Sequence, residues 1–416
     1  MLPPVLEIYV VWHPADNEGE VIANSLIEHF HGTAFSGLIG GAVEVFIRSQ
    51  PWADADGAPR PIPSPAQPLP HQIGLAAHTA IVPLLGVHLA GAVESNAGGW
   101  ADYVQEMAAI KDRHPDTVGI YPYSMDRRST DQTRLGQLLG QFQQIATPPY
   151  DAEGDSADGQ RARDLAQGIA QQLSRDANPR ITIFLSHTKK SSPNAQEDVS
   201  ALITQVRNVI ANTRLQEFFD ARDLQPGSDW DAVLRERAST SALLAIRTDL
   251  YPTREWCQRE MLISKRQGMP VVTMDALGEH EERGSFIMDH VPRVPVRANN
   301  NQWDRAGIYR ALNLLVDQCL KRALWNHQKE QANTRDALGI SWWAPHAPEP
   351  LTLIQWMEDS ENAGTLPAKD ADIRILHPDP PLGPDEYLVL QQMVRASGNH
   401  GRLDVMTPRL FAARGG

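Results

Sequence analysis

The sequence is short of cysteine and of positive charge. Cys257 and Cys319 are the only cysteines in 416 residues, too few for a disulfide framework or a cysteine-built zinc site. Lys and Arg number 38 against 51 Asp and Glu, so the formal net charge is -13. This balance argues against electrostatic binding of nucleic acid or anionic lipid. No apolar run approaches the length of a membrane span.

Targeting and metal-binding signals are also missing. The first residues, "MLPPVLEIYVVWHP", contain neither a basic segment nor a small-residue cleavage site, so no signal peptide is predicted. Together with the scarcity of cysteine, this predicts a reducing, cytoplasmic location. His29 and His31 lack a third ligand in their neighbourhood, so no metal site is predicted there.

Strand-like and helix-like segments alternate through the first third of the chain. We expect strands at residues 5–11, 43–47, 79–85 and 118–121, and helices at 21–30 and 103–110. Seven prolines between residues 51 and 70 exclude regular structure there. Such alternation is typical of a parallel α/β sheet, which predicts an α/β domain over residues 1–147.

A second alternating series follows an acidic linker rich in small residues at 148–160. Strands are expected at 181–185, 215–219, 242–246 and 271–274, and helices at 161–173, 199–210, 229–237 and 253–267. This predicts a second parallel α/β domain over residues 161–300. Residues 301–416 then contain a long helix at 305–329 and a small α/β region with strands at 373–376 and 403–406. That region is too small for a generous core, so we expect it to pack on a neighbour.

Polar residues gather where the strands of the second domain end. Ser186 and His187 follow its first strand, and Trp256 and Glu260 follow its third. The residues after its second strand include Asp220, Arg222, Asp223 and Trp230. Open parallel sheets bind ligands at the carboxyl ends of their strands, so this edge is the predicted site.

Trp256 and Glu260 are four residues apart on a predicted helix, and helix geometry returns them to nearly the same face. Pro252 precedes this helix, and Thr253 is the expected N-cap. An aromatic ring beside a carboxylate can stack on a flat cationic ring and stabilise a developing positive charge.

Four pieces of this domain carry a resemblance: "FLSHT", "FFDARDLQPGSDWDAVL", "SALLAIRTDLYPTREWCQRE" and "GMPVV". In their order and spacing they resemble the bacterial and plant type of Toll/interleukin-1 receptor (TIR) domain, over about residues 180–277. The family's W-C-x-x-E motif matches Trp256, Cys257 and Glu260. The serine that the family places before the tryptophan is absent at the expected spacing, and Thr253 is its candidate substitute.

The resemblance implies a flavodoxin-like TIR domain that cleaves the nicotinamide–ribose bond of NAD+, with Glu260 as the essential carboxylate. NAD+ would be the substrate, and no cofactor or metal is implied. Residues 220–230 match the family's BB loop, which closes over nucleotide or contacts a neighbouring protomer, and Ser186 and His187 would line the cleft. The family further implies activation by homo-oligomerisation and a role in bacterial defence against phage.

Several alternatives stay open. The domain could be a non-catalytic TIR scaffold that assembles through homotypic contacts, or a nucleoside deoxyribosyltransferase-like enzyme on a similar sheet. Glu260 could be a solvated helix residue, Trp256 a core residue and Cys257 a small packed hydrophobe. Ser186 and His187 could equally be simple loop residues, and Arg222 and Asp223 an ordinary solvated turn.

The first domain contains a related stretch, "GGWADYVQEM", in which Trp100 and Glu106 are six residues apart. That spacing rotates Glu106 away, and Val104 occupies the position four after the tryptophan. We therefore expect a degenerate TIR-like or flavodoxin-like module without a second active site. Through the flanking domains the chain could bind a sensor protein or a small-molecule signal.

Overall fold

The computed structural model divides into two compact units. It describes residues 4–32, 35, 42–52, 57–63, 76–145, 153–174, 181–188, 199–218, 241–278, 280–281, 284–299, 302–333, 339–378 and 380–414. Unit 1 comprises residues 1–152, 156–175 and 326–330, and unit 2 comprises 153–155, 176–325 and 331–416. Residues 161–173, which we had assigned to the second domain from the sequence, thus fall in unit 1.

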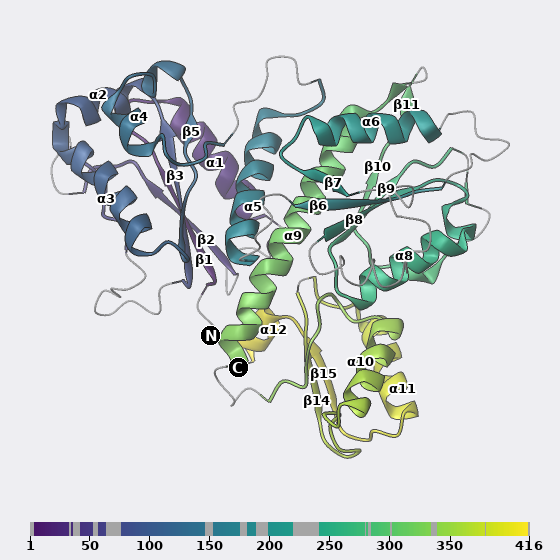
Figure 1. The fold of residues 1–416 in the computed structure, drawn as a ribbon. Coiled ribbons are helices and arrows are strands. Elements are labelled where there is room, and N and C mark those ends of the chain that lie inside the picture. Colours follow the sequence, from purple (N-terminus) through teal and green to yellow (C-terminus); the bar gives the residue numbers. More distant parts are fainter. Residues whose placement is uncertain are drawn as a thin grey trace. The chain divides into compact units, whose positions relative to one another are not determined.

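Unit 1 is a parallel α/β sheet with helices on both faces (Figure 1). Its elements are β1 (Leu6–Val11), α1 (Glu18–Phe30), β2 (Val43–Arg48), β3 (His78–Leu85), α2 (Val87–Ser95), α3 (Trp100–Arg113), β4 (Val118–Ile120), β5 (Tyr123–Ser124), α4 (Arg134–Leu139) and α5 (Ala157–Ser174). The strand order is β2-β1-β3-β4, and β5 pairs with the second half of β3. Strands are thus arranged second-first-third-fourth, as in doubly wound sheets of the flavodoxin type.

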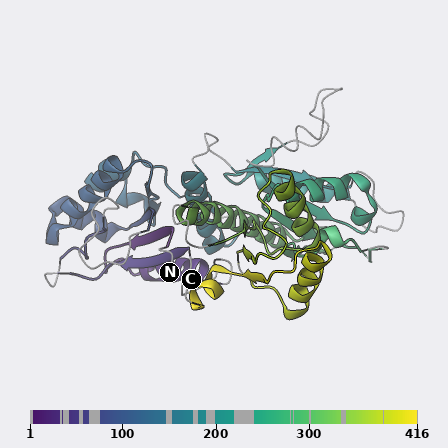
Figure 2. The same ribbon diagram turned by 90° about the horizontal axis from the view of Figure 1, so that it is seen from below.

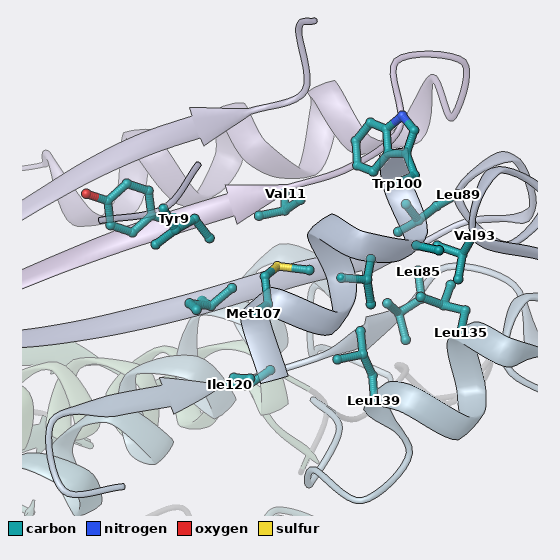
Figure 3. Packing of buried hydrophobic residues seen from close by; sticks show 14 of the residues in the cluster. Tyr9, Val11, Leu85, Leu89, Val93, Trp100, Met107, Ile120, Leu135 and Leu139 are labelled. Atoms are coloured by element: carbon teal, nitrogen blue, oxygen red, sulfur yellow. The ribbon is translucent and has the colours of Figure 1, made fainter. Parts of the chain in front are cut away.

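The main core of unit 1 lies between the sheet and helices α2, α3 and α4 (Figure 3). Tyr9 and Val11 of β1 and Leu85 of β3 face helical side chains from this layer. Trp100 and Met107 of α3 are almost fully buried there. Burying side chains of this size stabilises the sheet by about 1.5–3 kcal/mol each, which explains why the continuous apolar strands form.

Unit 2 contains a second parallel sheet of the same topology. Its elements are β6 (Thr182–Ser186), α6 (Val199–Ala211), β7 (Gln216–Phe218), β8 (Ser241–Arg247), α8 (Glu255–Arg266), β9 (Val271–Asp275), β10 (Arg293–Pro295), a short hairpin of β11 (Ala298–Asn299) and β12 (Gln302–Trp303), and most of α9 (Arg305–Asn333), whose residues 326–330 belong to unit 1. The strand order is β7-β6-β8-β9-β10, with every pairing parallel. Helices α6 and α8 cover opposite faces (Figure 1).

The C-terminal region, residues 339–414, is a small parallel α/β layer within unit 2. Its elements are β13 (Trp342–Trp343), α10 (Pro350–Asn362), β14 (Ile373–Leu376), α11 (Pro384–Ala396), β15 (Leu403–Met406) and α12 (Pro408–Ala413). The strand order is β13-β14-β15. In the view of Figure 2 this region, coloured yellow-green to yellow, lies toward the viewer.

A buried ion pair joins the C-terminal region to α8. The Lys265 ammonium lies 2.9 Å from a carboxylate oxygen of Glu349 and donates to the Asp289 carbonyl at 2.6 Å. Glu349 is also the N-cap of α10, where it forms a capping box with Thr352. Burial lowers the pKa of Lys265, and the Glu349 carboxylate opposes that change. Removing either partner would leave a buried charge unpaired, so the pair fixes the contact between α10 and α8.

The strand positions expected from the sequence are confirmed, and the α/β class with parallel sheets holds for both units. The helix expected at 229–237 lies outside the described residues. The structure adds elements that the sequence patterns did not indicate, chiefly α2, α4 and α10. Among the described residues, no helix is long and apolar enough to cross a membrane.

We expect His346 to make the protein less stable as the pH falls from about 6.5 to 4. Burial, reinforced by the cationic side chains of Arg322 and Lys265, lowers the pKa of His346 to about 4. In the unfolded chain His346 becomes protonated as the pH falls through about 6.5, whereas in the folded protein it stays neutral until about pH 4. The free energy of unfolding therefore decreases as the pH falls through this window.

Urea denaturation at pH 7 and at pH 4.5 would measure this effect. In a His346→Gln variant the loss between the two pH values should be smaller than in the wild type. The exposed His400 provides the control through His400→Gln, which should retain the wild-type loss. Equal losses in the wild type and His346→Gln would contradict the assignment.

Candidate functional site

The carboxyl edge of the unit 2 sheet brings together the ends of β6 and β8. The two strands pair in register, with Ser186 beside Ala245, so β8 extends two residues farther to Arg247. The strand order changes direction here, since the chain passes from β6 to β7 on one side and to β8 on the other. Ligands of doubly wound sheets bind at such a switch point.

A carboxylate lies buried at this edge. Glu260 is only 5% exposed, and its Oε2 accepts a hydrogen bond from the hydroxyl of Ser186. The Ser186 oxygen lies 2.6 Å from the hydroxyl of Tyr251, and both residues are fully buried. Ser186 has one proton, which it gives to Glu260, so Tyr251 donates to Ser186. The three side chains thus form a chain of hydrogen bonds that ends on the carboxylate.

The first turn of α8 positions Glu260. A short 3-10 helix at Tyr251–Thr253 follows β8, and α8 begins at Glu255 with Arg254 as its N-cap in an extended conformation. The expectation that Thr253 caps this helix is wrong. Its hydroxyl donates to the Leu250 carbonyl at 2.8 Å instead, because the 3-10 turn holds the residue outside α8.

Cys257 occupies the apolar face of α8 and packs as a hydrophobe. It is 2% exposed, and its thiol lies 3.8 Å from the carbonyl oxygen of His187. Burial, together with the negative charge of Glu260, raises the pKa of the Cys257 thiol to about 12. Because the thiolate is the nucleophilic form, this environment does not suit nucleophilic catalysis near neutral pH.

Trp256 and Glu260 have different environments although they are four residues apart. Trp256 is 39% exposed, and the guanidinium of Arg259 lies 6.0 Å from its ring centroid. Glu260 faces the sheet. The aromatic ring is therefore at the surface of α8, where it can contact a ligand or a second protein, while the carboxylate is inside.

His187 and Thr188 continue the edge beyond β6. His187 is partly buried, and its Nδ1 lies 3.1 Å from the Thr188 carbonyl oxygen. The hydroxyl of Thr188 lies 3.2 Å from that of Thr248, the residue that follows β8. This contact joins the two strand ends beside Ser186. Asp220, Arg222, Asp223 and Trp230, also expected at this edge, lie outside the described residues.

Arg247 ends β8 and is held by acidic side chains. Its guanidinium donates two hydrogen bonds to the carboxylate of Glu281 and lies 3.7 Å from Asp275 at the end of β9. These contacts raise the pKa of Arg247, the hydrogen bonds with Glu281 being the largest cause. Such a bidentate pair holds the edge in place and leaves Arg247 less available to an anionic ligand.

The corresponding edge of unit 1 is filled by a side chain of that unit. The carboxylate of Asp16, a residue 7% exposed, accepts hydrogen bonds from the amides of His88 and Leu89, both at 3.0 Å. These are the amides at the start of α2, where an anionic ligand would bind. A Cβ on Gly86 would lie 2.2 Å from the Asp16 carboxyl carbon, so the fit is close. Unit 1 therefore has no vacant anion site at this helix terminus.

The prediction that Glu106 points away from the core of unit 1 is confirmed. Its side chain is 55% exposed and pairs with Arg113, whereas Trp100 and Val104 are buried in the core. Unit 1 thus places a valine where unit 2 places Glu260.

Sequence reasoning missed the contributions of Tyr251 and Thr248 to the site. The signal that could have indicated Tyr251 is a tyrosine beside Pro252, directly before a helix and after a fully apolar strand. Nothing in the local pattern distinguishes its hydroxyl as a partner of Ser186, because the two residues are 65 positions apart.

Comparison with known sequences gives no further assignment. No protein-family model matches this chain, and the curated proteins contain no similar sequence.

We expect Asp16→Ala to lower the free energy of unfolding of unit 1 by about 1–2 kcal/mol, because two amides at the start of α2 lose their acceptor. Urea denaturation followed by circular dichroism would measure the loss. Asp102, an exposed acidic residue in the first turn of α3, provides the control through Asp102→Ala, which should change stability less. An equal effect of both substitutions would contradict the buried capping role of Asp16.

Proposed function

We propose that unit 2 contains a TIR domain that cleaves NAD+ and releases nicotinamide, with Glu260 as the catalytic carboxylate. The observation that carries the proposal is the position of this carboxylate. It lies at the switch point of a sheet with the order second-first-third-fourth-fifth, in hydrogen-bond contact with the last residue of β6. The W-C-x-x-E motif resembles that of TIR enzymes at this same helix.

The chemistry needs a negative charge more than a proton donor. When the nicotinamide–ribose bond breaks, its electron pair goes to the pyridinium nitrogen, and nicotinamide leaves as a neutral molecule. Positive charge develops on the ribose, and a carboxylate held in place stabilises it. Water then adds to the ribose carbon and loses a proton, giving ADP-ribose, or an adenine nitrogen adds and gives a cyclic product. Ser186 and Tyr251 would position the Glu260 carboxylate through their hydroxyls.

In the arrangement described here, Glu260 has little access to a substrate. It is 5% exposed, and Ser186 occupies one of its oxygens. The carboxylate must therefore become more accessible before it can face a ribose. We propose that the carboxylate becomes accessible when several copies assemble through this domain. Residues 220–230 would lie at or near the contact, and the exposed Trp256 would be available to it.

The same burial favours a second candidate function. A buried carboxylate that accepts a hydrogen bond from Ser186 can act as a structural residue, which suits a non-catalytic TIR scaffold. A nucleoside deoxyribosyltransferase-like enzyme would also use a carboxylate at such a sheet edge, but with nucleosides as substrates. An assay for free nicotinamide separates the three, because the scaffold gives no turnover and the transferase prefers nucleosides.

For an NAD+-cleaving TIR effector, the resemblance supports a role in cytoplasmic defence against phage. Unit 1 would then serve sensing or assembly, as a degenerate TIR-like or flavodoxin-like module. In unit 1 a buried valine, Val104, stands at the position of the carboxylate, and Asp16 binds the amides at the start of α2, which fits that division of roles.

We expect Glu260→Gln to reduce NAD+ cleavage by about 10²–10³-fold or more while the protein stays folded. The substitution keeps the size and the hydrogen bonding of the side chain but removes the negative charge. Release of nicotinamide from NAD+ by the purified full-length chain, followed by chromatography, would measure it.

Glu255 provides the matched control, because it is an exposed glutamate on the same helix. Glu255→Gln and the unit 1 variant Glu106→Gln should both retain activity. Loss of activity in Glu106→Gln equal to that in Glu260→Gln would show that the active site has been placed in the wrong unit.

We also expect the specific activity to rise with protein concentration, because assembly exposes the buried carboxylate. Light scattering and the nicotinamide assay, run on the same dilution series, would relate mass to rate. A strictly monomeric protein that cleaves NAD+ at full rate at every dilution would rule out activation by assembly.

A further inference from the structure

A cavity of about 760 Å³ with several charged side chains in its wall lies in unit 2, apart from the residues around Glu260. Its walls come from residues 153–154, from α6, from the β10–β12 segment and from the first turns of α9. This volume falls within the range of small-molecule sites. None of the residues assigned above to the proposed NAD+ site lines it.

Three arginines line this cavity: Arg297, which follows β10, and Arg305 and Arg310 of α9. Arg310 pairs with Asp304 at 3.1 Å, which neutralises one positive charge. The Nε atom of Arg305 is buried and has no hydrogen-bond partner in the described structure. Leaving a buried guanidinium nitrogen unpaired costs about 1–3 kcal/mol, more for a charged group, so the described part of the protein does not fully satisfy Arg305.

The cavity also contains the start of a long helix. Helix α9 is 29 residues long and begins at Arg305, so its first amides have no acceptor within the helix and its dipole favours an anion there. Gly154 passes close to this terminus with φ at +89°, and a Cβ on it would lie 2.8 Å from the Ala306 nitrogen. The glycine thus lets residues 153–154 form a wall directly over the first turn of α9.

The remaining lining residues suit a nucleoside better than a free phosphate. The buried residue Trp303 forms part of the cavity wall. Its carbonyl oxygen accepts a hydrogen bond from the Gln205 side chain at 3.0 Å, so α6 holds Trp303 in place. Glu153 is an exposed carboxylate on the rim. It would repel an isolated phosphate but can accept hydrogen bonds from ribose hydroxyls, as acidic residues do in dinucleotide sites.

We propose that this cavity binds a nucleoside diphosphate. Arg297 and Arg305 hold the diphosphate beside the first turn of α9, and the Glu153 carboxylate accepts hydrogen bonds from the ribose hydroxyls. Guanidinium groups favour phosphate oxygens because they donate paired hydrogen bonds in a fixed geometry. The site is independent of NAD+ cleavage, since it requires neither Glu260 nor turnover.

Titration calorimetry with ADP tests the proposal, using the full-length chain with Glu260→Gln so that catalysis plays no part. ADP should bind, inorganic pyrophosphate should compete with it more weakly, and adenosine should show at least tenfold weaker affinity. Arg297→Gln and Arg305→Gln should each weaken ADP binding about tenfold or more, and higher salt should weaken it further.

Arg293 provides the matched control. It lies on β10, is 42% exposed, and is not part of the cavity lining. Arg293→Gln should leave ADP affinity unchanged. Since Arg305 is partly buried, circular dichroism would confirm that its variant is folded, and the exposed Arg297 gives an independent reading. No binding of ADP at millimolar concentration, or equal binding in the Arg297, Arg305 and Arg293 variants, would overturn the proposal.

Discussion

The hydrogen-bonded chain from Tyr251 through Ser186 to Glu260 is the constraint on which the rest of unit 2 depends. A carboxylate inside a protein costs several kcal/mol unless polar partners replace water. Ser186 supplies one such partner from the end of β6, and Tyr251 orients that serine from the turn after β8. The end of β6 must therefore lie beside β8, and α8 must begin where it does, for Glu260 to be tolerated.

The two units have the same sheet topology but place different residues at its switch point. Both sheets place the second strand beside the first and the first beside the third. In unit 1 the switch point is closed by Asp16, which bonds to the amides at the start of α2. In unit 2 the acidic residue is on the helix after the third strand, one and a half turns from its start, with hydroxyl partners. The Asp16 carboxylate is bound by backbone amides of α2, whereas the Glu260 carboxylate accepts a hydrogen bond from a serine side chain, which can rearrange.

The sequence predicted the sheet far better than the site. Continuous apolar strands such as residues 242–246 are set by burial on both faces, a signal contained in a few consecutive residues. The start of α8 was misjudged because Thr253 and Pro252 fit two local structures, an N-cap and a 3-10 turn, and tertiary packing decides between them. Ser186, the partner of Glu260, is 74 positions away along the chain, and Tyr251, which bonds to Ser186, is 65 positions from that serine, so local periodicity could not reveal them.

Helix α8 links the carboxylate to the C-terminal region. Glu260 and Lys265 are five residues apart on α8, so they point to different sides of the helix. One side contacts the sheet through Ser186, and the other contacts Glu349 at the start of α10. The helix cannot rotate to expose Glu260 while the Lys265–Glu349 pair keeps its geometry, because that would leave a buried charge without its partner. Access to the Glu260 carboxylate and the packing of α10 on α8 are therefore coupled through helix α8.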